Sequence, residues 1–232
     1  MPFSQIADNL RDVRRRIAGA AADAGRDPDD VVLVVVTKTR SLDEVRAAVE
    51  AGAQDLGENY VQEMEEKAEA LADTGVRWHA IGHLQTNKIR NITPFISLIH
   101  SVDSPRVGRE IDRRAAQHER LVPFLLQVNV SGEESKFGVE PEAAAPLARE
   151  LVELEHSRLV GLMTMPPYCE DPNENRPYFQ RLRALRDELV NSGIPERNMR
   201  QLSMGMTCDF EVAVEEGATL VRVGSAIFGP RE

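Results

Sequence analysis

The chain has 232 residues, of which 42% are hydrophobic and 28% charged, as in an ordinary globular protein, and this length suits one domain over residues 1–232. A net charge of −10 argues against a nucleic-acid partner, which would require a basic face. Neither a signal segment nor an apolar run of membrane-spanning length is present, so we expect a cytoplasmic protein with no membrane partner.

The predicted elements alternate between strands and helices after an opening helix. Ile6, Leu10 and Ile17 stand at helical spacing within residues 3–25. Ser41, with Glu44 three residues later, is a typical helix N-cap pair. Strands are predicted from apolar runs at 31–37, 53–58, 76–82, 97–103, 123–130, 158–165, 200–205 and 219–224. The further helices are predicted at 41–52, 59–73, 86–95, 104–119, 141–155, within 173–193 and at 209–218, with a final turn at 225–229.

This alternation predicts a (β/α)8 TIM barrel with an extra N-terminal helix. The strands are continuous apolar runs, as is typical of parallel strands that are covered on both faces. A doubly wound open sheet is the alternative, but no G-x-G-x-x-G motif follows the first strand.

Polar or glycine residues follow the apolar runs, at the end of a barrel where active sites lie. Lys38 is one of these residues, and only four of the 28 basic residues are lysines. Partial desolvation there would lower the pKa of its amine, and a neutral amine forms a Schiff base with an aldehyde or ketone. The alternative is a strand-end lysine whose ammonium simply reaches water.

The last two strands are followed by glycine and serine residues that suit a phosphate group. Gly205 follows the seventh strand, and Gly224 and Ser225 follow the eighth, with Ser203 as a second hydroxyl donor. Phosphate sites in such barrels are often built from these two loops, because glycine lets the phosphate approach backbone N–H groups. Tight strand-to-helix turns are the alternative explanation.

A phosphate anchor and an imine-forming lysine together indicate a phosphorylated carbonyl compound. Pyridoxal 5′-phosphate (PLP) is one candidate, and a phosphosugar, as in a class I aldolase, is another. Arg222 stands among apolar residues of the eighth strand, so its guanidinium needs an acceptor inside the barrel. The pyridine nitrogen of PLP would supply one, and a structural salt bridge is the alternative.

Six ordered motifs carry a family resemblance over essentially the whole chain. They are TKT at 37–39, LGENYVQE at 56–63, WHAIGHLQTNK at 78–88, GLMTM at 161–165, LSMGM at 202–206 and VRVGSAIFG at 221–229. Together they resemble the YggS/PROSC family of PLP-binding, PLP-homeostasis proteins, whose fold is similar to the barrel domain of bacterial alanine racemase. Thr207-Cys208 departs from the Ser-Asp that is frequent in this family.

The resemblance implies a role for each candidate residue. Lys38 would carry PLP as a Schiff base, and Arg222 would face its pyridine nitrogen. Asn59 and Met163 would line the cofactor ring, and His83 would lie near the mouth. The phosphate contacts would come from Ser203, Gly205, Gly224 and Ser225.

The resemblance and Arg222 together favour PLP binding and vitamin B6 homeostasis over catalytic turnover. Arginine only donates hydrogen bonds, so the pyridine nitrogen would stay unprotonated and serve poorly as an electron sink. An amino-acid racemase is the alternative, although no second catalytic base is evident. We expect a monomer, with PLP-dependent apo-enzymes as candidate recipients of the cofactor.

Three further features are assigned lesser roles. Cys169 and Cys208 have neither disulfide-framework nor zinc-site spacing, and His79 and His83 lie on a strand-to-loop segment, so no metal is expected. Lys136 is either an ordinary loop lysine or a second lysine for the hand-over of PLP.

Overall fold

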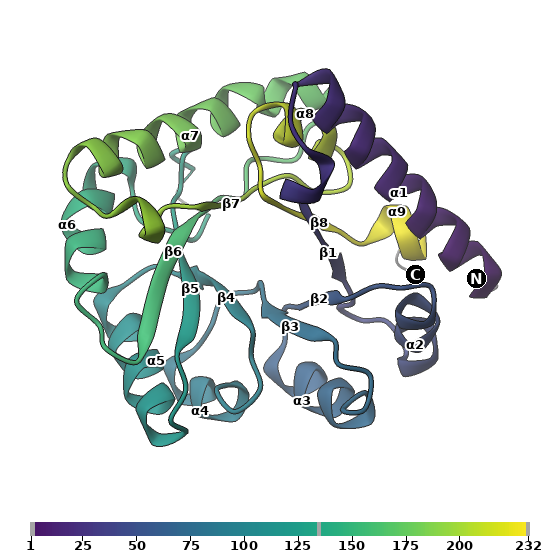
Figure 1. Ribbon diagram of the computed structural model, residues 1–232, viewed down its shortest axis with the longest axis horizontal. Coiled ribbons are helices and arrows are strands. Elements are labelled where there is room, and N and C mark those ends of the chain that lie inside the picture. Colours follow the sequence, from purple (N-terminus) through teal and green to yellow (C-terminus); the bar gives the residue numbers. More distant parts are fainter. Residues whose placement is uncertain (1–2, 134–135, 231–232) are drawn as a thin grey trace.

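The computed structural model describes residues 3–133 and 136–230 and confirms the predicted barrel (Figure 1). Eight parallel strands pair in chain order, and β8 closes the barrel by pairing with β1. Residues 1–2, 134–135 and 231–232 of the expected single domain lie outside the described residues. The strands are β1 (Val32–Val36), β2 (Asp55–Glu58), β3 (Arg77–Ala80), β4 (Leu98–Val102), β5 (Val122–Gln127), β6 (Ser157–Met163), β7 (Gln201–Ser203) and β8 (Leu220–Val223).

The helices lie around the outside of the barrel, and α1 runs beside α8 and α9 (Figure 1). Among the described residues, no helix is both long enough and apolar enough to cross a membrane. The α-helices are α1 (Phe3–Asp23), α2 (Leu42–Glu50), α3 (Val61–Ala70), α4 (Ile89–Ile92), α5 (Pro105–Gln117), α6 (Pro141–Leu151), α7 (Arg176–Asn191), α8 (Phe210–Glu215) and α9 (Ser225–Phe228). Short 3-10 turns are η1 (Pro28–Asp30), η2 (Thr86–Lys88), η3 (Pro172–Asn175) and η4 (Glu196–Asn198).

The start of α2 confirms the predicted capping residues. The Ser41 hydroxyl accepts a hydrogen bond from the Glu44 N–H at 3.3 Å, and the Glu44 carboxylate accepts one from the Ser41 N–H at 2.9 Å. Gly52 then ends the helix with a φ of 94°, which glycine adopts without steric cost. This capped start lies three residues after Lys38.

The predicted helix at 86–95 is shorter and less regular than the sequence indicates. Its first turn is the 3-10 turn η2, and only Ile89–Ile92 is α-helical. Pro94 cannot donate the next backbone hydrogen bond, so the helix stops there as predicted. The Thr93 hydroxyl also donates to the Ile89 carbonyl at 2.7 Å, which closes the last turn.

The barrel has an apolar layer on each side of its sheet. The larger layer lies between the strands and the surrounding helices, and α1 adds six buried residues to it. The smaller layer is a cluster inside the barrel, formed by Val34, Leu98, Leu125, Met163 and Leu220. The remaining inward positions include polar side chains, and these connect the interior to the site.

Candidate functional site

A cavity of about 450 Å³ opens at the C-terminal ends of the strands. The structure brings five predicted site residues together in its wall: Lys38, Asn59, Arg222, Gly224 and Ser225. They come from the ends of β1, β2 and β8, as a barrel mouth requires. The other lining residues are Val36, Ile81, Met165, Tyr168, Met206, Thr207 and Cys208.

The other four predicted site residues lie around this cavity rather than in its wall. Met163 is fully buried inside the barrel, and Met165 lines the cavity instead. Ser203 is fully buried below the mouth. Gly205 has a φ of 89°, and a Cβ there would lie 2.5 Å from the Cβ of Ala213, so glycine allows close packing against α8 at this position.

His83 lies in the loop after β3 and is 42% exposed. Its ring stacks on Phe137, with 4.3 Å between the ring centroids, and its Nδ1 is 3.7 Å from a carboxylate oxygen of Asp103. Phe137 neighbours Lys136 in the loop after β5. His83 therefore contacts the loop that carries Lys136, beside the mouth.

Ionic groups hold the backbone on both sides of Lys38. The Lys67 ammonium donates to the Thr37 carbonyl at 2.8 Å and to the Glu63 carboxylate at 3.0 Å. The same carboxylate accepts the Thr39 N–H at 2.9 Å. Thr39 has a φ of 62°, an uncommon value for a residue with a Cβ. Lys67 thus fixes the turn that presents Lys38 to the cavity.

Lys67 also pairs with Glu58, which is fully buried at the end of β2. The Nζ–Oε1 distance is 2.5 Å, and the Thr37 hydroxyl donates to the same carboxylate oxygen at 2.9 Å. Burial raises the pKa of Glu58, while the Lys67 ammonium and the Thr37 hydroxyl oppose that rise. The other Glu58 oxygen accepts the Asn59 N–H at 3.1 Å, so this pair also orients Asn59.

Arg222 presents a buried cation to the base of the cavity. It donates to the Ser203 hydroxyl and, at 2.8 Å, to the Thr164 carbonyl, and both acceptors are neutral. Within the part of the chain that the structure describes, Arg222 forms no ion pair with a carboxylate, so the structural salt bridge is not found there. Burial lowers the pKa of the guanidinium to about 10, so it remains charged at neutral pH.

A chain of hydrogen bonds runs from Arg222 through the barrel interior to Asp55. Ser203 Oγ lies 2.8 Å from Nδ1 of His100. Nε2 of His100 lies 2.9 Å from Nδ1 of His79, whose Nε2 is 3.0 Å from the Asp55 carboxylate. With neutral imidazoles, each residue donates to the next, because Asp55 can only accept. The chain therefore holds the Ser203 hydroxyl where it accepts from Arg222.

Burial and hydrogen bonds together set the charges along this chain. Burial lowers the pKa of His100 well below its usual value, and the nearby His79 and Arg222 act in the same direction. Burial also acts to raise the pKa of Asp55, but hydrogen bonds from His79 and Arg77 lower it overall. The interior therefore contains a neutral imidazole between a cation at the mouth and an anion near the opposite end.

Sequence reasoning missed the residues that support the site. His79 and His100 each stand in a strand whose other residues are mostly apolar, and that exception was the available signal, whereas Asp55 begins a short strand that also contains Glu58. Lys67 is one of only four lysines and stands four residues after Glu63, a spacing that permits an ion pair. Neither signal reveals which residue lies opposite across the fold.

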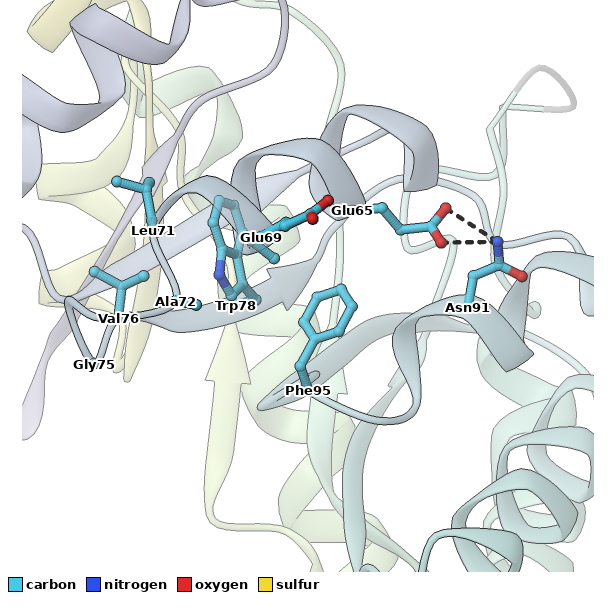
Figure 2. Close-up of a pocket in the computed structure, with 10 residues that line it drawn as sticks. Glu65, Glu69, Leu71, Ala72, Gly75, Val76, Trp78, Asn91 and Phe95 are labelled. Carbon is cyan, nitrogen blue, oxygen red and sulfur yellow. Dashed lines mark hydrogen bonds between the residues drawn. The ribbon is translucent and has the colours of Figure 1, made fainter.

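A second cavity, of about 470 Å³, lies on the outside of the barrel near α3 and α4 (Figure 2). Trp78 and Phe95 form part of its wall, and the Asn91 amide donates to both carboxylate oxygens of Glu65 at 2.9 and 3.0 Å. Its lining includes Glu65 and Glu69 but no lysine or arginine, so it does not suit a phosphorylated ligand. The cavity at the mouth remains the candidate site.

Comparison with known proteins agrees with this fold. Residues 3–232 match the family described as alanine racemase, N-terminal domain. An Aquifex aeolicus (strain VF5) protein named pyridoxal phosphate homeostasis protein is 44% identical over 97% of this chain and 98% of its own. A crystal structure of an unknown protein from Bifidobacterium adolescentis is 42% identical with a TM-score of 0.91, covering 97% of this chain and 95% of that one.

A structure of PipY from Synechococcus elongatus PCC7942 with PLP bound is 32% identical, with a TM-score of 0.84, over 97% of this chain and 100% of that one. The fold and these matches define a barrel of the alanine racemase N-terminal class. Within that class, the chain belongs to the family of pyridoxal phosphate homeostasis proteins.

Proposed function

We propose that this chain binds PLP at the mouth of its barrel and takes part in intracellular PLP homeostasis. One observation carries the proposal: a single cavity is lined by the Lys38 amine, the Arg222 guanidinium and the Gly224-Ser225 loop. The name of the Aquifex aeolicus relative and the PLP bound to PipY support the same cofactor.

The residues at the mouth fit three polar groups of PLP: its aldehyde, its pyridine nitrogen and its phosphate. Bound PLP supplies an aldehyde, which forms a Schiff base with a lysine amine as one water molecule leaves. Lys38 supplies that amine, and Arg222 supplies the donor for the pyridine nitrogen. The Thr207 and Ser225 hydroxyls line the same cavity and are the donors available to the phosphate. Thr207 thus takes a role that the sequence assigned to Ser203.

Gly224 makes room for the phosphate to approach the backbone. A Cβ at this position would lie 3.1 Å from both the Cβ and the carbonyl oxygen of Val36 on the neighbouring strand. A Cβ here would therefore crowd β1, and glycine lets the loop pass close to that strand. We propose that Gly205 supports the site by holding the loop between β7 and α8 against α8, and that it does not contact the phosphate directly.

Arg222 favours holding the cofactor over using it for turnover. Its guanidinium stays charged and has no acceptor atom, so it cannot leave a proton on the pyridine nitrogen. A residue that protonated this nitrogen would strengthen the withdrawal of electrons from a bound amino acid. The Ser203 and Thr164 contacts keep Arg222 in place without neutralising it.

A PLP titration of purified protein tests this assignment. The unmodified chain should develop the visible absorbance of a Schiff base, and Lys38→Ala should bind PLP without that band. Lys88→Ala is the matched control, because Lys88 lies in η2, outside the lining of the cavity, and should behave like the unmodified chain. An unchanged band in Lys38→Ala would overturn the role of Lys38.

An amino-acid racemase is the second candidate, and one observation favours it. Tyr168 lines the same cavity as Lys38 and is 83% exposed, so a phenol is available there as a second base. Solvent deuterium incorporation at Cα of alanine and other amino acids, with PLP added, would reveal such turnover. We expect none, and incorporation that is lost in Tyr168→Phe would favour the racemase instead.

In the cell, we propose that the protein is a cytoplasmic monomer in which residues 1–232 form one PLP-binding domain. PLP-dependent apo-enzymes are the proposed recipients of its PLP. Lys136 stays a prediction with two alternatives, an ordinary loop lysine or a second lysine for the hand-over of PLP. The contact between His83 and Phe137, the neighbour of Lys136, supports a position for that loop beside the mouth.

A further inference from the structure

The only two cysteines of the chain lie together, although 39 positions separate them in the sequence. Cys169 belongs to the segment between β6 and α7, and Cys208 to the loop between β7 and α8. Their thiols are close enough to hydrogen bond to each other, and the Asp209 carboxylate joins them. The three potential ligand atoms lie within 4.8 Å of one another.

These distances suit a tetrahedral metal ion. Zinc–sulfur bonds of about 2.3 Å at tetrahedral angles place two thiolates roughly 3.8 Å apart, so small side-chain rotations would suffice. Cys169 is 4% exposed and Asp209 is fully buried, while Cys208 also lines the cavity at the mouth. An ion can therefore reach the cluster from the cavity.

Asn175 orients two of the three ligands. Its side-chain amide donates to the Asp209 carboxylate at 2.7 Å and to the Cys169 sulfur at 3.1 Å. The other Asp209 oxygen accepts the Met206 N–H at 2.6 Å. Carboxylates that bind metal ions are characteristically held by hydrogen bonds from groups that do not touch the ion. This cluster has such hydrogen bonds in addition to its two neighbouring thiols.

We propose that Cys169, Cys208 and Asp209 form a binding site for a thiophilic divalent metal ion of the zinc class. Two thiolates and one carboxylate ligate the ion, and the two thiol protons pass to solvent as it binds. The resulting site carries one net negative charge. The site does not depend on PLP, so it can be measured without the cofactor.

The surroundings favour metal binding over a disulfide. Reactive cysteines lie beside positive groups, which stabilise the thiolate. Here the group within 4.8 Å of both sulfur atoms is the Asp209 carboxylate, which is negative and can itself ligate a cation. A coordinated ion removes the thiol protons directly.

Cobalt titration of the full chain tests the site. The protein is reduced with a phosphine, freed of metal with a chelator and titrated with Co²⁺ in the absence of PLP. We expect a thiolate-to-cobalt charge-transfer band that saturates at one ion per chain and disappears when Zn²⁺ is added. Cys169→Ser and Cys208→Ser should each lose the band, whereas Tyr168→Phe, next to Cys169, should keep it.

Two further measurements keep the result decisive if a serine variant does not fold. In the unmodified chain, Zn²⁺ should protect both cysteines from alkylation by iodoacetamide. Asn175→Ala should retain the band with affinity reduced about 10- to 100-fold. No cobalt band, no protection by Zn²⁺, or rapid formation of a Cys169–Cys208 disulfide on addition of glutathione disulfide would each overturn the proposal.

Discussion

At the scale of single residues, the Lys67–Glu58 pair is the main support of the lysine at the mouth. The Glu58 side chain is fully buried and that of Lys67 is 9% exposed, so removal of either partner leaves a charge without compensation. Because Lys67 also donates to the Thr37 carbonyl, the same change frees the backbone next to Lys38.

Lys67→Met should therefore destabilise the fold by about 3–5 kcal/mol, measured by urea unfolding. Combining it with Glu58→Gln removes both charges and should recover most of that loss, because no carboxylate then remains buried and unpaired. A single variant as stable as the parent, or a double variant no better than the single one, would contradict this account.

At the scale of elements, the interior hydrogen-bond chain joins β2, β3, β4, β7 and β8 and makes stability depend on pH. The pKa of His100 in the fold lies well below its unfolded value, so only the unfolded chain takes up this proton as pH falls. Stability is thus greatest above about pH 6.5 and decreases below it, by up to about 1.4 kcal/mol per pH unit from this group.

His100→Gln should flatten this decrease, because glutamine can still hydrogen bond but does not titrate. Urea unfolding at a series of pH values below neutrality measures the slope for each protein. His156→Gln, a change at an exposed position after α6, should leave the slope of the parent unchanged. An equal slope in His100→Gln and the parent would show that other groups cause the pH dependence.

The contact between β6 and β7 depends on Gly161. A Cβ at this position would lie 1.9 Å from the Gln201 carbonyl oxygen on the neighbouring strand, so Gly161→Ala would force the strands apart. We expect a loss of about 1–3 kcal/mol in thermal or urea unfolding. Gly19→Ala, in α1 with open space around it, should instead stabilise by about 0.5–1 kcal/mol.

At the scale of the whole molecule, the sequence predicts the barrel well because its signals are local. Apolar runs indicate all eight strands, and Ser41 with Glu44 indicates the start of α2. The hydrogen-bond chain in the barrel interior could not be predicted in this way, since His100 and Ser203 stand 103 positions apart and meet only when the barrel closes. Local patterns do not encode such partners.

The sequence indicates which side of a strand a residue faces. It indicates less well how deep in the barrel that residue lies. Met163 and Met165 stand two positions apart, so strand periodicity puts them on the same side. The structure puts Met163 in the interior cluster and Met165 in the cavity wall. The same uncertainty in depth explains why Ser203 lies below the mouth, bonded to Arg222, while Thr207 lines it.

The N-terminal helix α1 ties the site to the rest of the molecule. Arg16 forms two hydrogen bonds, at 2.7 and 2.8 Å, with the Glu211 carboxylate on α8, and the Asn9 amide donates to the Ile227 carbonyl on α9 at 2.9 Å. The loop that carries Thr207 leads into α8, and Ser225 is the first residue of α9. The added helix thus braces the proposed phosphate side of the cavity.

The most direct test of the central claim is to locate PLP on the chain itself. Protein loaded with PLP is reduced with borohydride, digested and mapped by mass spectrometry. The account predicts a single phosphopyridoxyl group on Lys38, with Lys67, Lys88 and Lys136 unmodified. Modification mainly at another lysine, or no modification of the chain, would contradict it.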